Sequence, residues 1–204
     1  MTAGRTINSQ SHHWGTPLHY INAVKKVFNV EVIDLDPCSN NYSLVNAMIE
    51  YKLPKMDGLL EQWNYKTIYV NPPYGSDKIR KTTIKNWLKK CHDTYDKFNS
   101  EIIALVPVAT NTSHWKKYVW VSASAVCFLH DTRLKFLVDG KCGGKGAPMS
   151  CAMIYWGKNI ERFFEVFSEY GSIINTDINI KYKINTYNFR KDNLFEFDKL
   201  QLAM

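Results

Sequence analysis

The sequence TIYVNPPY, at residues 67–74, decides how this chain folds around its site. Its apolar first half predicts a buried β-strand. Two consecutive prolines follow Asn71, and proline has no N–H to donate to a β-ladder. The strand therefore ends before Pro72, and the loop after it is stiff because each proline fixes φ and restricts the residue before it. The result is a rigid lip that carries an amide, on Asn71, and an aromatic ring, on Tyr74.

This lip suits the methylation of a planar exocyclic amine, whose lone pair is delocalised into its ring. The Asn71 side-chain oxygen and the Pro72 carbonyl can accept the two amine hydrogens, which favours a pyramidal nitrogen and aims its lone pair at an electrophile. Tyr74 can stack on the ring, so that catalysis comes from positioning and fixed dipoles. The plain alternative is a strand that ends in a turn at Gly75. The candidate catalytic residues are Asn71, Pro72, Pro73 and Tyr74.

The composition is that of an ordinary globular protein. The chain has 204 residues, of which 45% are hydrophobic and 22% charged, and this size favours one domain. No stretch approaches the roughly 18 apolar residues of a membrane span, and residues 1–14 lack an apolar signal core. We expect a cytoplasmic protein that does not enter a membrane.

The cysteines favour neither a disulfide framework nor a metal site. There are five, and they are dispersed without a CxxC pair. An odd, scattered set argues against both a disulfide-stapled fold and zinc binding. We expect no metal.

The charge points to a polyanionic partner. The formal net charge is +7, and residues 78–90 hold six cations and no acid. A basic cluster directly after the lip favours nucleic acid, although a solvated helix face is the plain alternative. The candidate nucleic-acid contacts are Lys78, Arg80, Lys81, Lys85, His114, Lys116, Arg133, Lys135, Lys141 and Lys145.

Two groups of these cations have distinctive surroundings. Four of them lie before or within the glycine-rich segment 139–147, which can track phosphates as a mobile basic loop or can be a plain hairpin tip. It is not a Walker A loop, because Asp139 and Gly146 replace the required residues. His114 and Lys116 flank Trp115, a mixture typical of nucleic-acid surfaces, although Trp115 equally suits a core.

Strands alternate with helices along the chain, which predicts an α/β fold. We expect strands at 30–35, 67–70, 101–108 and 125–129, and a strand pair formed by 133–137 and 149–156. Helices are expected at 16–28, with Thr16 as N-cap and Pro17 at the first position, and at 84–98, 112–121 and 160–167. Residues 39–56 show no clear strand, and the tail from Ile173 is β-like or irregular.

Three unusual segments fall at or near strand ends, where α/β sheets bind ligands. Acids after the first strand can bind a ligand ammonium or ribose hydroxyls. The Asp57 carboxylate can accept from an adenine amino group, with Leu59 against the ring. Capped turns are the plain alternative for both. The candidates after the first strand are Asp34, Asp36, Pro37, Cys38 and Ser39, and no glycine-rich fingerprint accompanies them.

Seven segments together resemble the phage-type Dam family of DNA adenine-N6 methyltransferases. They are WGTPLHYINAVKKVFN, IDLDPCSNN, DGLLEQW, IYVNPPYG, LVPVATNTSHW, RLKF and GAPMSCAMIYWG. They span about residues 14–157, and nothing beyond 157 has an assignable match. The combination is far more specific than NPPY alone.

The resemblance implies S-adenosylmethionine as methyl donor, DNA as partner, and a Rossmann-like class I methyltransferase fold. That fold would have a mostly parallel sheet, flanking helices and a C-terminal strand pair. The resemblance places Asn71 to Tyr74 in the catalytic motif, with Asn71 also near the cofactor. It places Asp57 near the cofactor adenine, and Asp36, Pro37 and Ser39 in the first cofactor loop. Thr16 and Pro17 match a segment near the methionine part of the cofactor.

We therefore expect an enzyme that methylates adenine N6 in DNA after base flipping, in a bacterial cell or encoded by a phage. Residues 1–13 would be a flexible leader, 14–157 the methyltransferase domain, and 158–204 an extension packed on it. Adenine in RNA, a protein glutamine, N4-cytosine, and a non-catalytic nucleic-acid-binding protein with this fold remain alternatives. The charge favours nucleic acid among them. The recognition sequence, the oligomeric state and any role in restriction–modification stay open.

Overall fold

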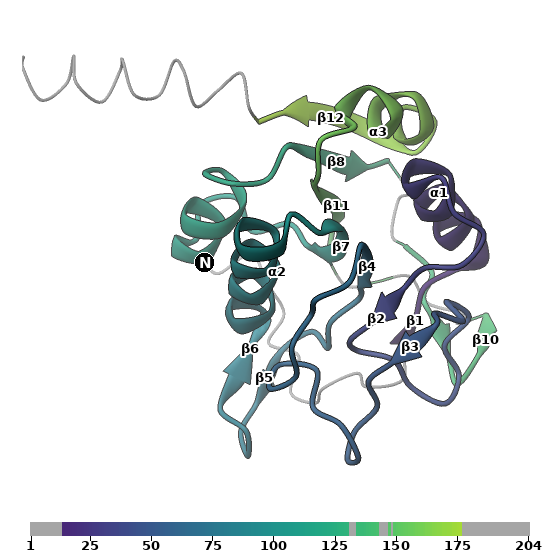
Figure 1. The fold of residues 1–204 in the computed structure, drawn as a ribbon, viewed down its shortest axis with the longest axis vertical. Coiled ribbons are helices and arrows are strands. Elements are labelled where there is room, and N and C mark those ends of the chain that lie inside the picture. The colour runs from purple at the N-terminus through teal and green to yellow at the C-terminus, as the bar shows by residue number, and fades with distance from the viewer. Residues whose placement is uncertain (1–13, 131–133, 143–146, 148, 177–204) are drawn as a thin grey trace, which may run out of the picture.

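The structure, a computed structural model, describes residues 14–130, 134–142, 147 and 149–176 (Figure 1). In this part of the chain, seven strands form a central sheet in the order β12-β8-β11-β7-β4-β2-β3. Their bounds are β2 (Leu35–Asp36), β3 (Ile49–Glu50), β4 (Thr67–Val70), β7 (Glu101–Pro107), β8 (Ala125–Leu129), β11 (Cys151–Trp156) and β12 (Gly171–Asn175).

Two smaller sheets and four helices complete the described fold. β9 (Leu137–Val138) pairs with β1 (Trp14–Gly15) and with β10 (Lys141–Cys142). β5 (Ser76–Asp77) and β6 (Thr82–Thr83) form a hairpin. The helices are α1 (Leu18–Phe28), α2 (Ile84–Phe98), the π-helix η1 (Trp115–Val119) and α3 (Ile160–Phe167).

The α/β class is confirmed, but the expectation of a mostly parallel sheet is wrong. Strands β3, β2, β4 and β7 run parallel, whereas β7, β11, β8 and β12 pair antiparallel. Two consecutive strands can pair in parallel only if a long crossover connection, usually a helix, joins them. The described residues between β8 and β11 contain no helix, and β11 accordingly runs antiparallel to β8.

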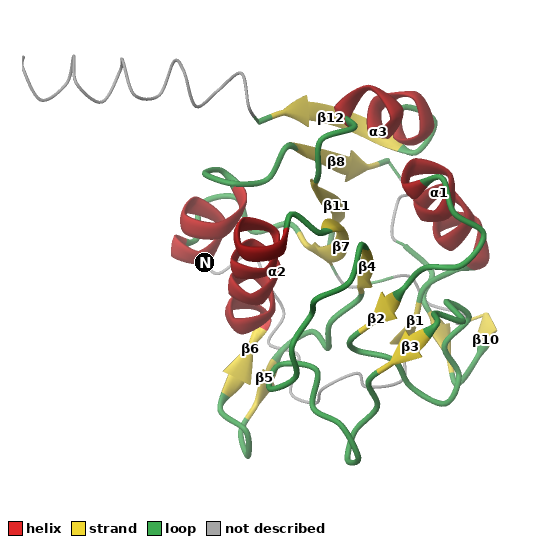
Figure 2. Ribbon diagram, in the orientation of Figure 1, coloured by secondary structure: helices red, strands yellow, loops and turns green. Residues whose placement is uncertain are grey.

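Helices cover both faces of the sheet (Figure 2). One core lies under α1 and α3 and takes Tyr69 and Ile103 from the strands. The other lies under α2 and η1 and takes Ile68 and Ile102. Successive residues of β4 and β7 thus point to opposite faces. All of β4 and the five central residues of β7 are buried, which explains their continuous apolar sequences.

Strands 67–70 and 125–129 are confirmed as β4 and β8, and 101–108 appears as β7. The helices expected at 84–98 and 160–167 are α2 and α3, and 112–121 contains η1. A capping box between Thr83 and Asn86 fixes the start of α2 directly after the hairpin.

Other boundaries were predicted wrongly. The strand expected at 30–35 is reduced to β2, and β3 was missed. Helix α1 starts at Leu18 with Pro17 as its N-cap residue, because the Thr16 hydroxyl contacts the Tyr69 hydroxyl, 2.7 Å away, rather than capping the helix. The pair of 133–137 with 149–156 does not form, since β9 joins β1 and β11 joins the central sheet.

The proposed leader, residues 1–13, lies outside the described residues, as does 177–204. The described part of the C-terminal region, residues 158–176, contributes α3 and β12. Helix α3 packs on α1 and β8, and β12 forms the last strand of the central sheet beside β8.

Candidate active site

A cavity of about 370 Å³ opens where three loops meet. These loops follow β2, β3 and β4, which run parallel, so their carboxyl ends share one edge of the sheet. Its lining includes residues of the three predicted segments: Pro37, Cys38, Ser39, Asp57, Asn71, Pro72, Pro73 and Tyr74. The expected convergence of these segments is therefore present, and the volume suits a small-molecule ligand.

The orientation of the Asn71 amide is set by the first strand of the described chain. Its Nδ2 donates to the main-chain carbonyl of Trp14 at 3.0 Å. Only the amide nitrogen can donate to a carbonyl, so this contact distinguishes the two ends of the side chain. Oδ1 is left as an acceptor, and no donor from the described residues contacts it. Asn71 and Trp14 both line the cavity.

Tyr74 is fixed within an aromatic wall. Its side chain is only 2% exposed, and its hydroxyl donates to the Leu105 carbonyl at 3.1 Å. Trp14 and Phe136 stack on each other with ring centres 5.1 Å apart, and both meet the Tyr74 ring edge-on. Burial raises the pKa of the Tyr74 hydroxyl well above its ordinary value, so it stays protonated.

The loop after β2 presents Cys38 and Ser39 to the cavity and holds Asp36 behind them. The Asp36 carboxylate accepts from the Cys38 N–H at 3.1 Å and from the Ser43 hydroxyl at 3.2 Å. Burial, and to a smaller extent the nearby charge of Glu50, raises the pKa of Asp36 to about 7. This carboxyl therefore changes charge near neutral pH.

Four other predicted cofactor contacts do not line the cavity: Thr16, Pro17, Asp34 and Leu59. Asp34 joins neighbouring strands, since its Oδ2 accepts from the Thr67 N–H at 2.9 Å and its N–H donates to the Thr67 hydroxyl at 3.0 Å. Thr16 is buried against Tyr69, and Pro17 stands at the start of α1. Asp34, Thr16 and Pro17 therefore stabilise the strands and the helix that surround the cavity.

The loop after β3 is held by its own sequence motif. The Asp57 carboxylate accepts from the Leu59 N–H at 3.0 Å, and the Gly58 carbonyl accepts from the Trp63 indole at 2.7 Å. A Cβ on Gly58 would lie 1.9 Å from the Pro37 carbonyl oxygen, so only glycine lets the two loops approach. Asp57 lines the cavity and Leu59 does not.

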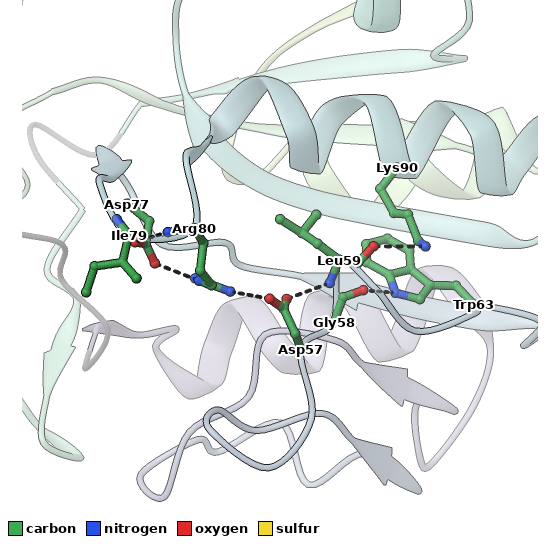
Figure 3. A network of polar contacts seen from close by, with 8 residues as sticks. All are labelled: Asp57, Gly58, Leu59, Trp63, Asp77, Ile79, Arg80 and Lys90. Atoms are coloured by element: carbon green, nitrogen blue, oxygen red, sulfur yellow. Dashed lines mark hydrogen bonds and ion pairs between the residues drawn. The ribbon is translucent and has the colours of Figure 1, made fainter.

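Arg80 lines the cavity, and two carboxylates bind it, so it is not a free surface cation (Figure 3). Its Nη1 donates to Asp57 at 2.9 Å, and its Nε donates to Asp77 at 2.6 Å. Its buried Nη2 has no partner among the described residues. Because Arg80 is paired with two carboxylates, only its unpaired Nη2 could contact nucleic acid without breaking an ion pair.

Of the other predicted nucleic-acid contacts, six lysines are exposed and one histidine is half-buried. Lys78, Lys81, Lys85, Lys116, Lys135 and Lys141 are exposed. His114 is half-buried beside Thr112, and burial followed by the charge of Lys85 lowers the pKa of His114. Lys85 and His114 therefore belong to one surface, where α2 packs on η1. Trp115 is buried in the core, and Arg133 and Lys145 lie outside the described residues.

Sequence reasoning missed several residues of the cavity. Trp14 opens a segment that was noted only for its resemblance, and Arg80 was assigned by charge alone. Others follow β2 or β3, whose short strands gave no periodic signal. The missed lining residues include Trp14, Asn40, Asn41, Tyr42, Tyr51, Arg80 and Trp87.

The described residues contain no group of three or more His, Cys, Asp or Glu side chains arranged to hold a metal ion. None of their helices has the length and apolar character required to span a bilayer.

Comparison with known protein families finds a match over most of the chain. A family model described as DNA N-6-adenine-methyltransferase (Dam) matches residues 3–185 of the 204. The match includes every segment quoted above and extends past residue 157, where sequence reasoning found no resemblance. A search of curated proteins finds no match.

Proposed function

The chain belongs to the Dam family of DNA N-6-adenine-methyltransferases, and from this premise we propose that it transfers a methyl group from S-adenosylmethionine to adenine N6 in DNA through Asn71 to Tyr74. The family implies the methyl donor and the DNA substrate. The observation that carries the residue assignment is that the NPPY lip lines the cavity together with the loops after β2 and β3.

The cavity residues fit a cationic, adenosine-containing ligand. S-adenosylmethionine carries an ammonium and a sulfonium group, and carboxylates near its site would favour both charges. Asp57 lines the cavity with one oxygen paired to Arg80, and Asp36 lies behind the loop of Cys38 and Ser39. Tyr42 and Tyr51 add aromatic surface to the lining. When bound, the cofactor supplies an electrophilic methyl group.

The lip residues act on the target amine. Asn71 Oδ1 accepts one amine hydrogen, and the Pro72 carbonyl accepts the other, which frees the nitrogen lone pair. The Trp14 carbonyl keeps the Asn71 amide in the required orientation before the substrate arrives. Tyr74 supplies a fixed aromatic wall, because the Leu105 carbonyl and two neighbouring rings hold it in place.

The amine of a stacked adenine is out of reach, so the base has to leave the duplex, at a cost of a few kcal/mol. Exposed cations near the lip would hold the backbone on either side and supply most of the affinity. We assign this role to Lys78, Lys81 and Lys85, with Lys116 on the adjoining surface of η1. His114, half-buried at the start of η1 and with a lowered pKa, would contact the backbone as an uncharged hydrogen-bonding group.

The parallel half of the sheet supports a Rossmann-like class I fold, since its four strands end at the same edge of the sheet and the loops after three of them, β2, β3 and β4, line the cavity. We also propose that residues 158–176 belong to the same domain as 14–157. Strand β12 extends the central sheet through β8, and α3 contributes Phe163 and Phe167 to the core.

Asn71→Ala tests the proposal, with Asn22→Ala, an exposed change on α1, as its control. We expect the Asn71 variant to lose about 10²-fold or more of its turnover, the range for removing one group of a preorganised site. Calorimetry should show that it still binds S-adenosylmethionine. Turnover is measured with labelled cofactor and unmethylated DNA, and the modified base is mapped by sequencing.

One outcome would contradict the role of Asn71, and another would contradict the proposed substrate. Equal turnover of the Asn71 variant and the wild type would remove Asn71 from catalysis. A wild type that labels RNA or protein, but no DNA under any salt condition, would refute the proposed substrate.

A further inference from the structure

The hairpin after the catalytic lip ends in an exposed isoleucine. β5 and β6 pair Ser76 with Thr83 and Asp77 with Thr82, which leaves residues 78–81 as the turn. Ile79 lies in this turn and is 93% exposed, more than any other large hydrophobic side chain in the described residues. Exposing an isoleucine forgoes the favourable free energy of burying its side chain. Isolated exposed apolar residues are common, so exposure alone assigns no role to Ile79, whereas its surroundings do.

The tip that carries Ile79 is held rigidly. One oxygen of Asp77 accepts from the backbone N–H groups of Ile79 and Arg80, each at 2.9 Å. The other accepts from the Arg80 side chain. The side chain of isoleucine is itself stiff because it is β-branched. The apolar group is therefore presented in a defined direction.

The same tip is tied to the cavity wall. Arg80 reaches from the turn to Asp57 (Figure 3), and both residues line the cavity. The hairpin also begins two residues after Tyr74, at the end of the lip. The position of Ile79 is thus fixed relative to the place where a target base would be held.

Positive charge stands on both sides of the apolar tip. Lys78 precedes Ile79 and Lys81 ends the turn, and both are exposed. Lys81 adopts a positive φ of 54°, as tight turns require. Cations that bracket one apolar side chain match a DNA duplex, in which phosphates flank the edge of the base stack. A purely apolar partner would leave these charges unmatched.

We propose that Ile79 is a wedge that enters the base stack and stabilises the extruded state of the target adenine, while Lys78 and Lys81 hold the neighbouring phosphates. Apolar side chains inserted between base steps are an established means of unstacking DNA. This inference rests on the proposed function, because it assigns the step that brings adenine to the lip.

The test uses Ile79→Ala with Ile174→Ala as a matched control. Ile174 is also exposed, but it lies on β12, at the opposite edge of the central sheet from β2 and β3. Methylation is measured on a matched duplex and on the same duplex with a mismatched base opposite the target adenine. A mismatched adenine costs less to extrude.

We expect Ile79→Ala to lower kcat/KM about 10- to 100-fold on the matched duplex, since a few kcal/mol of extrusion cost corresponds to such factors. On the mismatched duplex the loss should be less than about threefold by the same argument. The Ile174 variant should match the wild type on both. With 2-aminopurine at the target position, the fluorescence increase on binding should shrink in Ile79→Ala only.

Each other outcome has a defined meaning. An equal loss on both duplexes would show that Ile79 supports binding or folding rather than extrusion. No loss on either would show that the tip does not enter DNA and leave its exposure for another partner. A wild type inactive on all DNA would overturn the proposed function instead, and an active wild type with an unaffected Ile79 variant would overturn only the wedge.

Discussion

The Asp36 carboxyl is the group in the candidate site whose charge responds to pH near neutrality. Burial is the main cause of its raised pKa, and hydrogen bonds from Cys38 and Ser43 only partly oppose it. The pKa is 3.8 in the unfolded reference and about 7 in the folded protein. Between these values the folded state binds more protons than the unfolded state. The contribution of Asp36 to stability is therefore full at low pH and is lost as the pH rises through this window.

Asp36→Asn should remove this dependence, because asparagine has the size of aspartate and does not ionise. We expect the free energy of unfolding of the variant to exceed that of the wild type at pH 8 by on the order of 1–4 kcal/mol. The two should converge toward pH 4. Thermal unfolding measured across this range checks the prediction. Asp96→Asn, a change at an exposed residue, is the control. If the stabilities of the wild type and of Asp36→Asn changed in parallel with pH, the prediction for Asp36 would be wrong.

Single residues differ in how far the sequence can predict them. Asn71 to Tyr74 could be placed at a strand end because two prolines restrict their own backbone. The bond from Asn71 to Trp14 could not be predicted, because it joins positions 57 residues apart. The pairing of Arg80 with Asp57 was hidden for the same reason, and charge alone suggested a surface role.

Helix α2 shows how one basic run serves different purposes. Lys89 pairs with Asp93, one turn further along. Lys90 donates to the carbonyl of Glu61 at 2.7 Å and so helps to hold the loop after Asp57. Among these cations, Lys81 and Lys85 are exposed and make no ion pair with the described residues. They lie at or beside the start of the helix, close to the hairpin.

The double variant Lys81→Gln with Lys85→Gln should weaken DNA binding and reduce its salt dependence. Each lost phosphate contact lowers the slope of log Kd against log salt concentration by about 0.9, so a change of about 1–2 is expected. Lys89→Gln, the control, should leave the slope unchanged because Lys89 is already neutralised by Asp93. Fluorescence anisotropy with labelled DNA at several salt concentrations measures both. An equal effect of the control would place the DNA elsewhere on α2.

Helices and strands could be predicted where the hydrophobic pattern of their own residues is long enough to identify them. The apolar runs of β4 and β7 and the periodic face of α2 each extend far enough to show a pattern. Strands β2 and β3 have two residues each, too few for any period. The direction of β11 depends on pairing with β7 and β8, which is a property of the whole sheet rather than of its own sequence.

At the scale of the molecule, the cavity forms because the loops after the parallel strands β2, β3 and β4 contact one another. Gly58 against the Pro37 carbonyl brings the loops after β3 and β2 into contact. The Arg80–Asp57 ion pair joins the hairpin to the same group. A ligand that contacts all of these segments would stabilise the folded state as a unit, since binding only the folded form raises its stability.

S-adenosylmethionine should therefore raise the melting temperature of the wild type. At 100 times the dissociation constant, the gain is about 2.7 kcal/mol, or roughly 5–11 °C for a chain of this size. Gly58→Ala should lose most of this shift, because its Cβ would lie 1.9 Å from the Pro37 oxygen and force the two loops apart. In Gly15→Ala the new Cβ would lie 3.4 Å from Leu137, an ordinary contact, so this control should keep the shift.

Differential scanning fluorimetry with and without the cofactor measures these shifts. If Gly58→Ala kept the full shift, the cofactor would not depend on the contact between the two loops, and the cavity would have to be assigned to another ligand. If the wild type showed none, while still methylating DNA, the cofactor would bind the folded and unfolded chains alike or only in the presence of DNA. Adding a DNA duplex to the same measurement separates these two cases, because only the second restores the shift.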